Sequence, residues 1–188
     1  MSPGAFVAAF AVGLLLAIGL FIVVASYNAV IQLRQRIDKA SANIDVVLKQ
    51  RHDQLPALVS AVRGLMAFEA GVLEDVTRAR AAYSPTEPIP DKATHAEATT
   101  TAVRSLFAVM EAYPTLKSHG NVMELQDSIE RLESMLADRR ELYNDQVYRY
   151  NTRITTFPTV AITPVFGWRP RDFFEAAPAD RQRPDTTL

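Results

Sequence analysis

AFVAAFAVGLLLAIGLFIVVAS occupies residues 5–26 and contains no charged side chain. About 20 apolar residues, rising about 1.5 Å each in a helix, span the hydrocarbon core of a bilayer. A cleaved signal peptide has a basic segment followed by a shorter apolar stretch of about 7 to 15 residues, and this sequence has neither. The stretch therefore predicts that residues 1–26 form a transmembrane anchor in a single-pass protein of the cell inner (plasma) membrane.

The charges beside this stretch predict its orientation. Only MSPG precedes it, whereas Arg34, Arg36 and Lys39 follow it against a single Asp38. Short cytoplasmic flanks carry an excess of lysine and arginine. We therefore expect the N-terminus outside the cell and the C-terminal part of the chain in the cytoplasm.

Beyond the anchor, apolar residues recur at alternating spacings of three and four, which is typical of a helix packed on other helices. They are Val30, Leu33, Ile37, Ala40, Ile44 and Val47. No proline or glycine lies between Gly19 and Pro56, so this helix is predicted to run unbroken to about residue 51. Pro56 with Asp53 as its N-cap then predicts a second helix over residues 53–82.

Prolines delimit the remaining helices. The run SPTEPIPD at residues 84–91 predicts a connection, a third helix follows over 94–112 and ends at Tyr113-Pro114, and a fourth runs from Asn121 to a stop at Pro158. The sequence thus predicts an all-α fold, in which the N-terminal transmembrane helix continues into an antiparallel up-and-down four-helix bundle over residues 27–157. Residues 158–188 form an aromatic and proline-rich tail, which is expected to be disordered after about residue 176.

Composition argues against most kinds of chemistry. The chain has no cysteine and a formal net charge of -1, which excludes thiolate sites and disfavours nucleic-acid binding. His52, His95 and His119 lack partners at metal-ligand spacing, and no catalytic motif is present. We therefore expect no enzymatic activity, no cofactor, no metal and no small-molecule substrate.

Three Tyr-Asn pairs form a candidate polar layer: Tyr27-Asn28, Tyr143-Asn144 and Tyr150-Asn151. The last two lie one heptad apart and share a helix face, and an alternating bundle would return residue 150 to the level of residue 27. Their hydroxyl and amide groups could then fix the register of the helices at the membrane surface. The alternative is that they are ordinary core tyrosines with solvated hydroxyl groups.

The tail offers a candidate contact surface of aromatic and basic residues: Phe166, Trp168, Arg169, Arg171, Phe173 and Phe174, with Val165 beside them. Aromatic rings interleaved with arginine suit the headgroup region of a bilayer. The rings could equally close the open end of the bundle core. The sequence leaves both interpretations open.

Four ordered blocks resemble the bacterial LemA family over roughly residues 26–175. They are SYNAVIQLRQRIDKASANIDVVLKQRHDQLPALVSAVRGL, EAYPTLKSHGNVMELQDSIERLE, RRELYNDQVYRYNTRITTFP and FGWRPRDFFE. Ser41 departs from the pattern, because the family usually has tryptophan there. The resemblance implies one N-terminal membrane helix and a four-helix bundle, with no established enzymatic activity and no cofactor.

Together these features predict a non-enzymatic scaffold or adaptor that acts at the membrane through self-assembly or through other membrane proteins. The alternative from another class is a regulatory subunit of a membrane-bound enzyme such as a protease. An enzyme in its own right would require that side chains far apart in the sequence converge.

Overall fold

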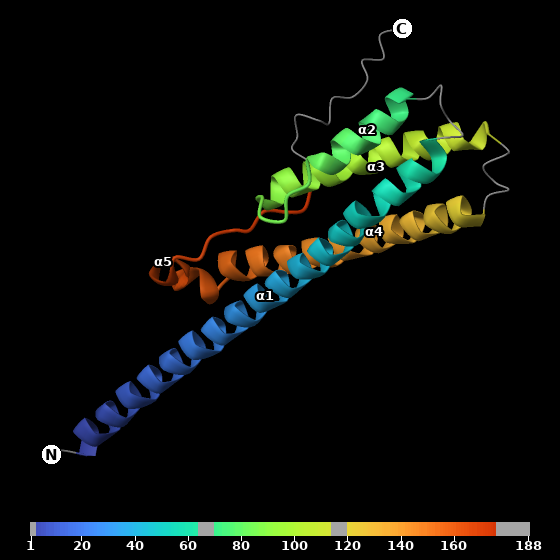
Figure 1. Cartoon of the computed structure of the whole chain (residues 1–188). Helices are drawn as coiled ribbons and strands as arrows, with labels where there is room; N and C mark the ends of the chain where they lie inside the picture. Colours follow the sequence, from blue (N-terminus) through green and yellow to red (C-terminus); the bar gives the residue numbers. More distant parts are fainter. Residues whose placement is uncertain (1–2, 64–69, 114–119, 176–188) are drawn as a thin grey trace, which may run out of the picture. The chain divides into compact units, whose positions relative to one another are not determined.

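The structure, a computed structural model, describes residues 3–63, 70–113 and 120–175. These residues form helices and turns and contain no strand (Figure 1). The helices are α1 (Pro3–Arg63), α2 (Ala70–Ala81), α3 (Ile89–Glu111), α4 (Gly120–Thr155), the 3-10 helix η2 (Thr159–Ala161) and α5 (Thr163–Phe166). The predicted all-α class is confirmed, and so is the long apolar N-terminal helix. The predictions for Pro114, for His119 and for the order of the tail after residue 176 lie outside the described residues.

The predicted break before Pro56 is wrong, because α1 continues through this proline to Arg63. A proline inside a helix leaves the carbonyl group four residues earlier without its N–H donor. That carbonyl belongs to His52, and it accepts a hydrogen bond of 3.0 Å from the Arg80 guanidinium of α2. Asp53, the predicted N-cap, is an exposed residue of the helix interior. A side chain from another helix thus replaces the bond that Pro56 cannot make.

The second and third helices differ from their predicted bounds. α2 covers Ala70–Ala81 in place of the predicted 53–82. α3 begins at Ile89, before the predicted Thr94, because Pro90 lies in the first helical turn, where its missing N–H is not needed. The first bond into α3 runs from the Lys92 N–H to the Pro88 carbonyl at 2.9 Å.

The fourth helix is close to the prediction, and short helical turns follow it. α4 ends at Thr155, and the proline-rich segment behind it forms η2 and α5. Gly167 ends α5 in the left-handed region with φ 62°, a conformation that favours glycine because it has no Cβ. The turn brings the Trp168 N–H within 3.2 Å of the Thr163 carbonyl.

The chain divides into two compact units, each built from segments far apart in the sequence. The first unit comprises residues 1–39 and 145–171, and the second comprises residues 40–144 and 172–188. The expected division of the chain into an anchor to residue 26, a bundle to residue 157 and a tail stays a prediction.

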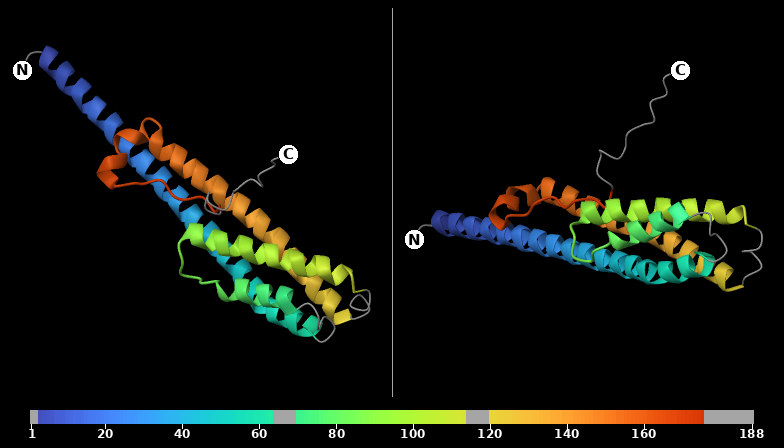
Figure 2. Two further views of the ribbon diagram at one scale, coloured as in Figure 1. Left: turned by 90° about the horizontal axis from the view of Figure 1, so that it is seen from above. Right: turned by 45° about the horizontal axis from the view of Figure 1, so that its top comes forward.

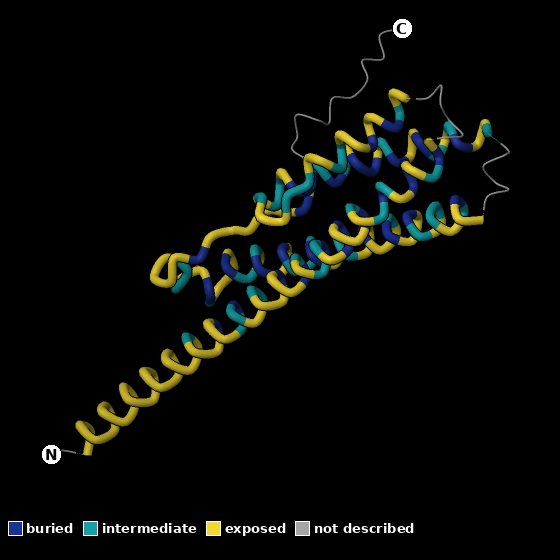
Figure 3. The backbone as a smooth tube through the Cα atoms, in the orientation of Figure 1, coloured by how far each residue is buried: buried dark blue, intermediate teal, exposed yellow. Residues whose placement is uncertain are grey.

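In the first unit, the end of α4 lies beside α1, and the segment with η2 and α5 turns back along it (Figures 1 and 2). The buried apolar side chains are Val30, Ile37, Val147, Tyr150, Ile154 and Trp168. Residues 3–22, which make up most of the apolar N-terminal part of α1, are exposed (Figure 3).

In the second unit, four helical segments contribute to one apolar core, and α2 lies next to α3. The core side chains are Leu55, Leu58, Val59, Val62, Leu73, Val76, Val103, Leu106, Met110, Val122 and Ile129. Removing such side chains from water is the main favourable contribution to folding. The same helix α1 therefore supplies buried residues to both units.

Candidate functional site

In the second unit, one Tyr-Asn pair of α4 holds the main chain of the C-terminal segment. The Tyr143 hydroxyl donates to the Asp172 carbonyl at 3.0 Å. The Asn144 amide accepts from the Phe174 N–H at 2.7 Å and donates to the Phe174 carbonyl at 3.4 Å. We call this set of bonds the Asn144 clamp. It binds a stretch of extended chain through backbone groups alone.

The side chain of Phe174 anchors the same stretch. Its ring is fully buried and meets the ring of Tyr143 edge-on at 6.4 Å between centroids. The guanidinium carbon of Arg140 lies 5.3 Å from the centre of the Phe174 ring, a geometry in which a cation is attracted to the ring face. Phe174 is therefore a packing anchor inside the second unit.

The first unit repeats the arrangement with the second pair. The Tyr150 hydroxyl donates to the Arg169 carbonyl at 3.1 Å. The Asn151 amide accepts from the Arg171 N–H at 2.8 Å and donates to the Arg171 carbonyl at 3.0 Å. In this Asn151 clamp, as in the Asn144 clamp, the asparagine binds the residue two positions after the one bound by the tyrosine.

Aromatic rings of the first unit gather at the end of the apolar stretch. Phe166 and Trp168 stack with their ring centroids 5.0 Å apart. Tyr27 lies 5.1 Å from Phe166 and 6.0 Å from Trp168. Trp168 is buried, whereas Phe166 is partly exposed.

The remaining predicted residues lie on the surface. Asn28, Arg169, Arg171 and Phe173 are exposed, and Arg171 lies 3.9 Å from the carboxylate of Asp38. The tyrosines and asparagines of α4 bond to the main chain of the tail rather than to another helix. Their predicted role in fixing the register of the helices stays a prediction. The two clamps themselves could not be found from the sequence, because the distance between α4 and the tail is a tertiary property.

The second unit also buries an arginine. The Arg51 guanidinium of α1 donates to the Glu133 carboxylate of α4 at 2.7 Å and to the Thr100 hydroxyl of α3 at 2.9 Å. It also donates to the Ala96 carbonyl at 3.2 Å. The Thr100 hydroxyl lies 2.8 Å from the second oxygen of Glu133. Three helices are thereby joined around one cation, and a buried charge requires such compensation.

A second buried cation and a histidine pair lie near the start of α3. The Lys92 ammonium donates to the Asp45 carboxylate of α1 at 2.5 Å and to the Pro85 carbonyl at 3.3 Å. His95 lies 2.8 Å from the Glu87 carboxylate. Sequence reasoning missed both buried cations, although Arg51 continues the spacing of four that follows Val47 and so occupies a core position.

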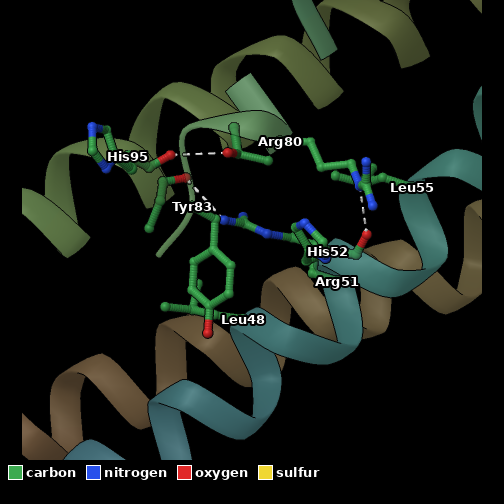
Figure 4. A pocket seen from close by; sticks show the side chains of 9 residues that line it. Leu48, Arg51, His52, Leu55, Arg80, Tyr83 and His95 are labelled. Carbon is green, nitrogen blue, oxygen red and sulfur yellow. Dashed lines mark hydrogen bonds between the residues drawn. The ribbon is translucent and has the colours of Figure 1, made fainter. Parts of the chain in front are cut away.

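Polar side chains of these helices surround a small cavity (Figure 4). Its volume is about 10 Å³, and its lining includes Arg51, His52, Arg80, Tyr83 and His95. About one water molecule fits such a volume. From the sequence, His52 and His95 were predicted to be unrelated to each other. The fold places both at one half-buried cavity.

Tyr83 lies at this cavity, with its ring centroid 5.6 Å from that of His52. Burial raises the pKa of Tyr83 above its usual value, and the negative charges of Asp45, Glu87 and Asp53 raise it further. The hydroxyl therefore stays protonated at neutral pH. Within the described residues, no three histidine, aspartate or glutamate side chains are grouped as metal ligands.

Charge is divided unequally between the units. The first unit has seven basic residues against two acidic ones, a formal charge of +5, and the second unit has -6. The first unit's charged residues are Arg34, Arg36, Lys39, Arg149, Arg153, Arg169 and Arg171, with Asp38 and Asp145. The net charge of -1 for the whole chain thus conceals a basic and an acidic part.

The chain is therefore a helical protein in which the N-terminal helix α1 is long and apolar enough to cross a membrane. The sequence profile of the LemA family matches residues 40–187. The chain belongs to the LemA family, as its sequence blocks predict.

Curated relatives share a shorter region. Magnetosome proteins MamQ 2 and MamQ 1 of Paramagnetospirillum magneticum are each 33% identical to the chain over 78 residues, which is 42% of this chain and 29% of theirs. Magnetosome protein MamQ of Magnetospirillum gryphiswaldense is 30% identical over the same length. The match thus spans less than a third of the length of these relatives.

Proposed function

We propose that this protein is a non-enzymatic, membrane-anchored scaffold or adaptor, whose helices form an antiparallel four-helix bundle that binds other copies of the chain or other membrane proteins. The observation that carries this proposal is the double character of α1. Its N-terminal 18-residue apolar window has none of its residues buried in the protein, while later residues such as Ile44 and Leu55 are buried among neighbouring helices. One helix thus joins a lipid-facing segment to the packed helical domain.

The interior of the second unit supports a structural role over a catalytic one. General acid-base catalysis needs titratable groups that can reach a substrate. Here Glu133 is bound to Arg51 and Asp45 to Lys92, and the cavity beside them has the size of one water molecule. These groups join helices to one another, which supports a structural role for them.

The charge of the first unit supports an orientation with the helical domain in the cytoplasm. Its basic residues follow the apolar stretch directly in sequence or return to it in space within the unit. Lysine and arginine near the end of a span favour the cytoplasmic side. Because the chain has no cysteine, a single cysteine in place of the exposed Tyr148 reports the orientation. We expect a membrane-impermeant maleimide to label it in inverted vesicles and not in intact spheroplasts.

Affinity capture of the full-length chain in native nanodiscs tests the scaffold role. We expect a ladder of self-assembled species or several membrane proteins after crosslinking. Capture of one enzyme at a fixed stoichiometry would instead support a regulatory subunit. The matched control replaces residues 5–26 with an unrelated single span, which keeps the anchor but changes its lipid-facing sequence. A species that disappears with this exchange depends on the span and not on the helical domain.

A further inference from the structure

The turn that follows α4 exposes an unusual amount of apolar surface. Residues 157–168, FPTVAITPVFGW, contain no charged side chain. Phe157 is 84% exposed, Val165 79%, Val160 44% and Phe166 42%. Scattered exposed apolar residues are ordinary, but a contiguous group marks an interaction surface.

The turn is attached to the end of the apolar stretch of α1. Tyr27 directly follows the 22 uncharged residues 5–26, and its ring lies 5.1 Å from that of Phe166. A helix of this length covers about 33 Å, close to the thickness of the hydrocarbon core. A bilayer around residues 5–26 therefore ends near Tyr27, at the level of the exposed turn. Figures 1 and 2 show this turn, at the orange and red end of the described chain, beside α1.

The backbone of the turn suits an apolar environment, where an unbonded N–H group is costly. Pro158 and Pro164 have no N–H group. The N–H groups of seven further residues donate to carbonyl groups within the turn or at the end of α4, at distances of 2.9 to 3.3 Å. These residues are Val160, Ala161, Ile162, Val165, Phe166, Gly167 and Trp168. The Thr163 hydroxyl also donates to the Ile154 carbonyl at 2.8 Å.

The charges around the turn indicate which kind of surface it contacts. The first unit carries a formal charge of +5, and Arg153 and Arg169 flank the uncharged segment in sequence. Basic groups near a bilayer are attracted to anionic headgroups, and apolar side chains insert at the boundary between headgroups and acyl chains. The pattern of an apolar tip with a basic rim fits an anionic lipid surface.

We propose that residues 157–166 form a second membrane contact, which inserts into the headgroup region of an anionic bilayer beside the transmembrane part of α1. The inference rests on the proposed anchoring by residues 5–26. It assigns the lipid contact to Phe157, Val160, Val165 and Phe166. Trp168 and Phe174 are buried in the protein and serve as anchors of the tail.

A second protein or a second copy of this chain is the competing occupant of the surface. Three observations favour lipid: the turn adjoins a segment of membrane length, seven of its ten backbone N–H groups are bonded, and the unit around it is basic. A protein partner would account for the exposed side chains but not for their position at the end of the span.

Spin labels on single cysteines test the contact in the full chain, which has no native cysteine. The variants are Val160→Cys and Val165→Cys in the turn, Tyr148→Cys as an exposed control on α4, and Leu16→Cys as a control within the span. Each is reconstituted into vesicles of phosphatidylcholine with phosphatidylglycerol and into vesicles of phosphatidylcholine alone. Collision rates with oxygen report lipid, and those with a water-soluble nickel chelate report water.

In the anionic vesicles we expect both turn labels to be oxygen-rich and nickel-poor, like Leu16→Cys, and Tyr148→Cys to be nickel-rich. Without anionic lipid the nickel collision rate of the turn labels should rise several-fold. Nickel-accessible turn labels beside a lipid-embedded Leu16→Cys would overturn the inference and leave the anchoring intact, whereas a water-exposed Leu16→Cys would overturn the anchoring itself. Turn labels shielded from both reagents would indicate a protein occupant, and equal depths in both lipids would overturn the selectivity for anionic lipid.

Discussion

The two units differ in how they bury polar groups. The second unit encloses two cations, Arg51 and Lys92, each bonded to a carboxylate. In the described part of the first unit, the buried polar residues are the neutral Ser26 and Thr159. The first unit has only two acidic residues in its sequence, so few carboxylates are available to compensate a buried cation. None of the arginine or lysine residues in the described part of the first unit is a buried residue, and anionic lipid attracts such charges.

Both units use the same device to hold the tail. Asn144 and Asn151 each bond to the N–H and the carbonyl group of one tail residue, and the preceding tyrosine bonds to the carbonyl two positions earlier. Bonds to the backbone do not depend on the side chain that the tail presents. The difference lies in the clamped residue: Phe174 is buried, whereas Arg171 is exposed. Only the Asn144 clamp coincides with an apolar anchor.

The largest effect is expected from the ionic interior of the second unit. Glu133→Ala leaves the Arg51 guanidinium buried without a carboxylate, so the free energy of unfolding should fall by about 3 kcal/mol. Urea unfolding of the full chain in detergent measures this. The control Glu130→Ala removes an exposed carboxylate from the same helix and should change stability by less than about 0.5 kcal/mol. Equal effects of the two substitutions would show that the buried pair adds nothing.

The anchor of the tail comes next. Phe174→Ala removes a fully buried ring, which typically costs about 3 kcal/mol when the whole protein must reorganise, and less when only a terminal segment detaches. We expect loss of hydrogen-exchange protection at the amide of Phe174, measured by mass spectrometry of peptides covering residues 172–175. Phe173→Ala, at a partly exposed neighbour, should leave this protection in place. Loss of protection in both variants would contradict the anchoring role of Phe174.

The two clamps can be compared directly. Asn144→Ala removes two hydrogen bonds in a partly buried setting and should lower stability by about 1.5 kcal/mol. Asn151→Ala removes the equivalent bonds at the surface, where water replaces them, and should cost about 0.5 kcal/mol. Paired unfolding curves measure the difference. A larger loss from Asn151→Ala would reverse our ranking of the clamps.

Sequence patterns predicted those parts of the fold that depend on local spacing. The uncharged run at residues 5–26 and the alternating spacing of three and four from Val30 to Val47 identify a long helix, because helix periodicity depends on local spacing alone. The proline rule failed at Pro56, since the missing bond at the His52 carbonyl is replaced by Arg80, 28 residues away. No local rule can anticipate a donor from another helix.

The candidate sites show the same limit. The tail rings were identified as contact residues, but their division into buried Trp168 and Phe174 and exposed Val165 depends on which helix face the tail meets. The spacing of α1 gives Arg51 a core position, but the sequence does not show that Glu133 lies opposite it. Pairing across helices, rather than residue type, decides these roles.

The smallest effect concerns Tyr83 and the acidic character of the second unit. Burial and three nearby carboxylates raise the pKa of Tyr83 in the folded protein, so the folded state binds this proton more tightly than the unfolded state. The resulting stability is fully present below the ordinary tyrosine pKa of about 10 and is lost as pH rises through the folded-state value.

The free energy of unfolding should therefore fall more steeply above about pH 10 in the wild type than in Tyr83→Phe. Because the other titrating groups are common to the two proteins, their contributions cancel in the difference. If Tyr83→Phe keeps the wild-type slope, Tyr83 titrates equally in both states, and the acidic surroundings of the cavity have no effect on it.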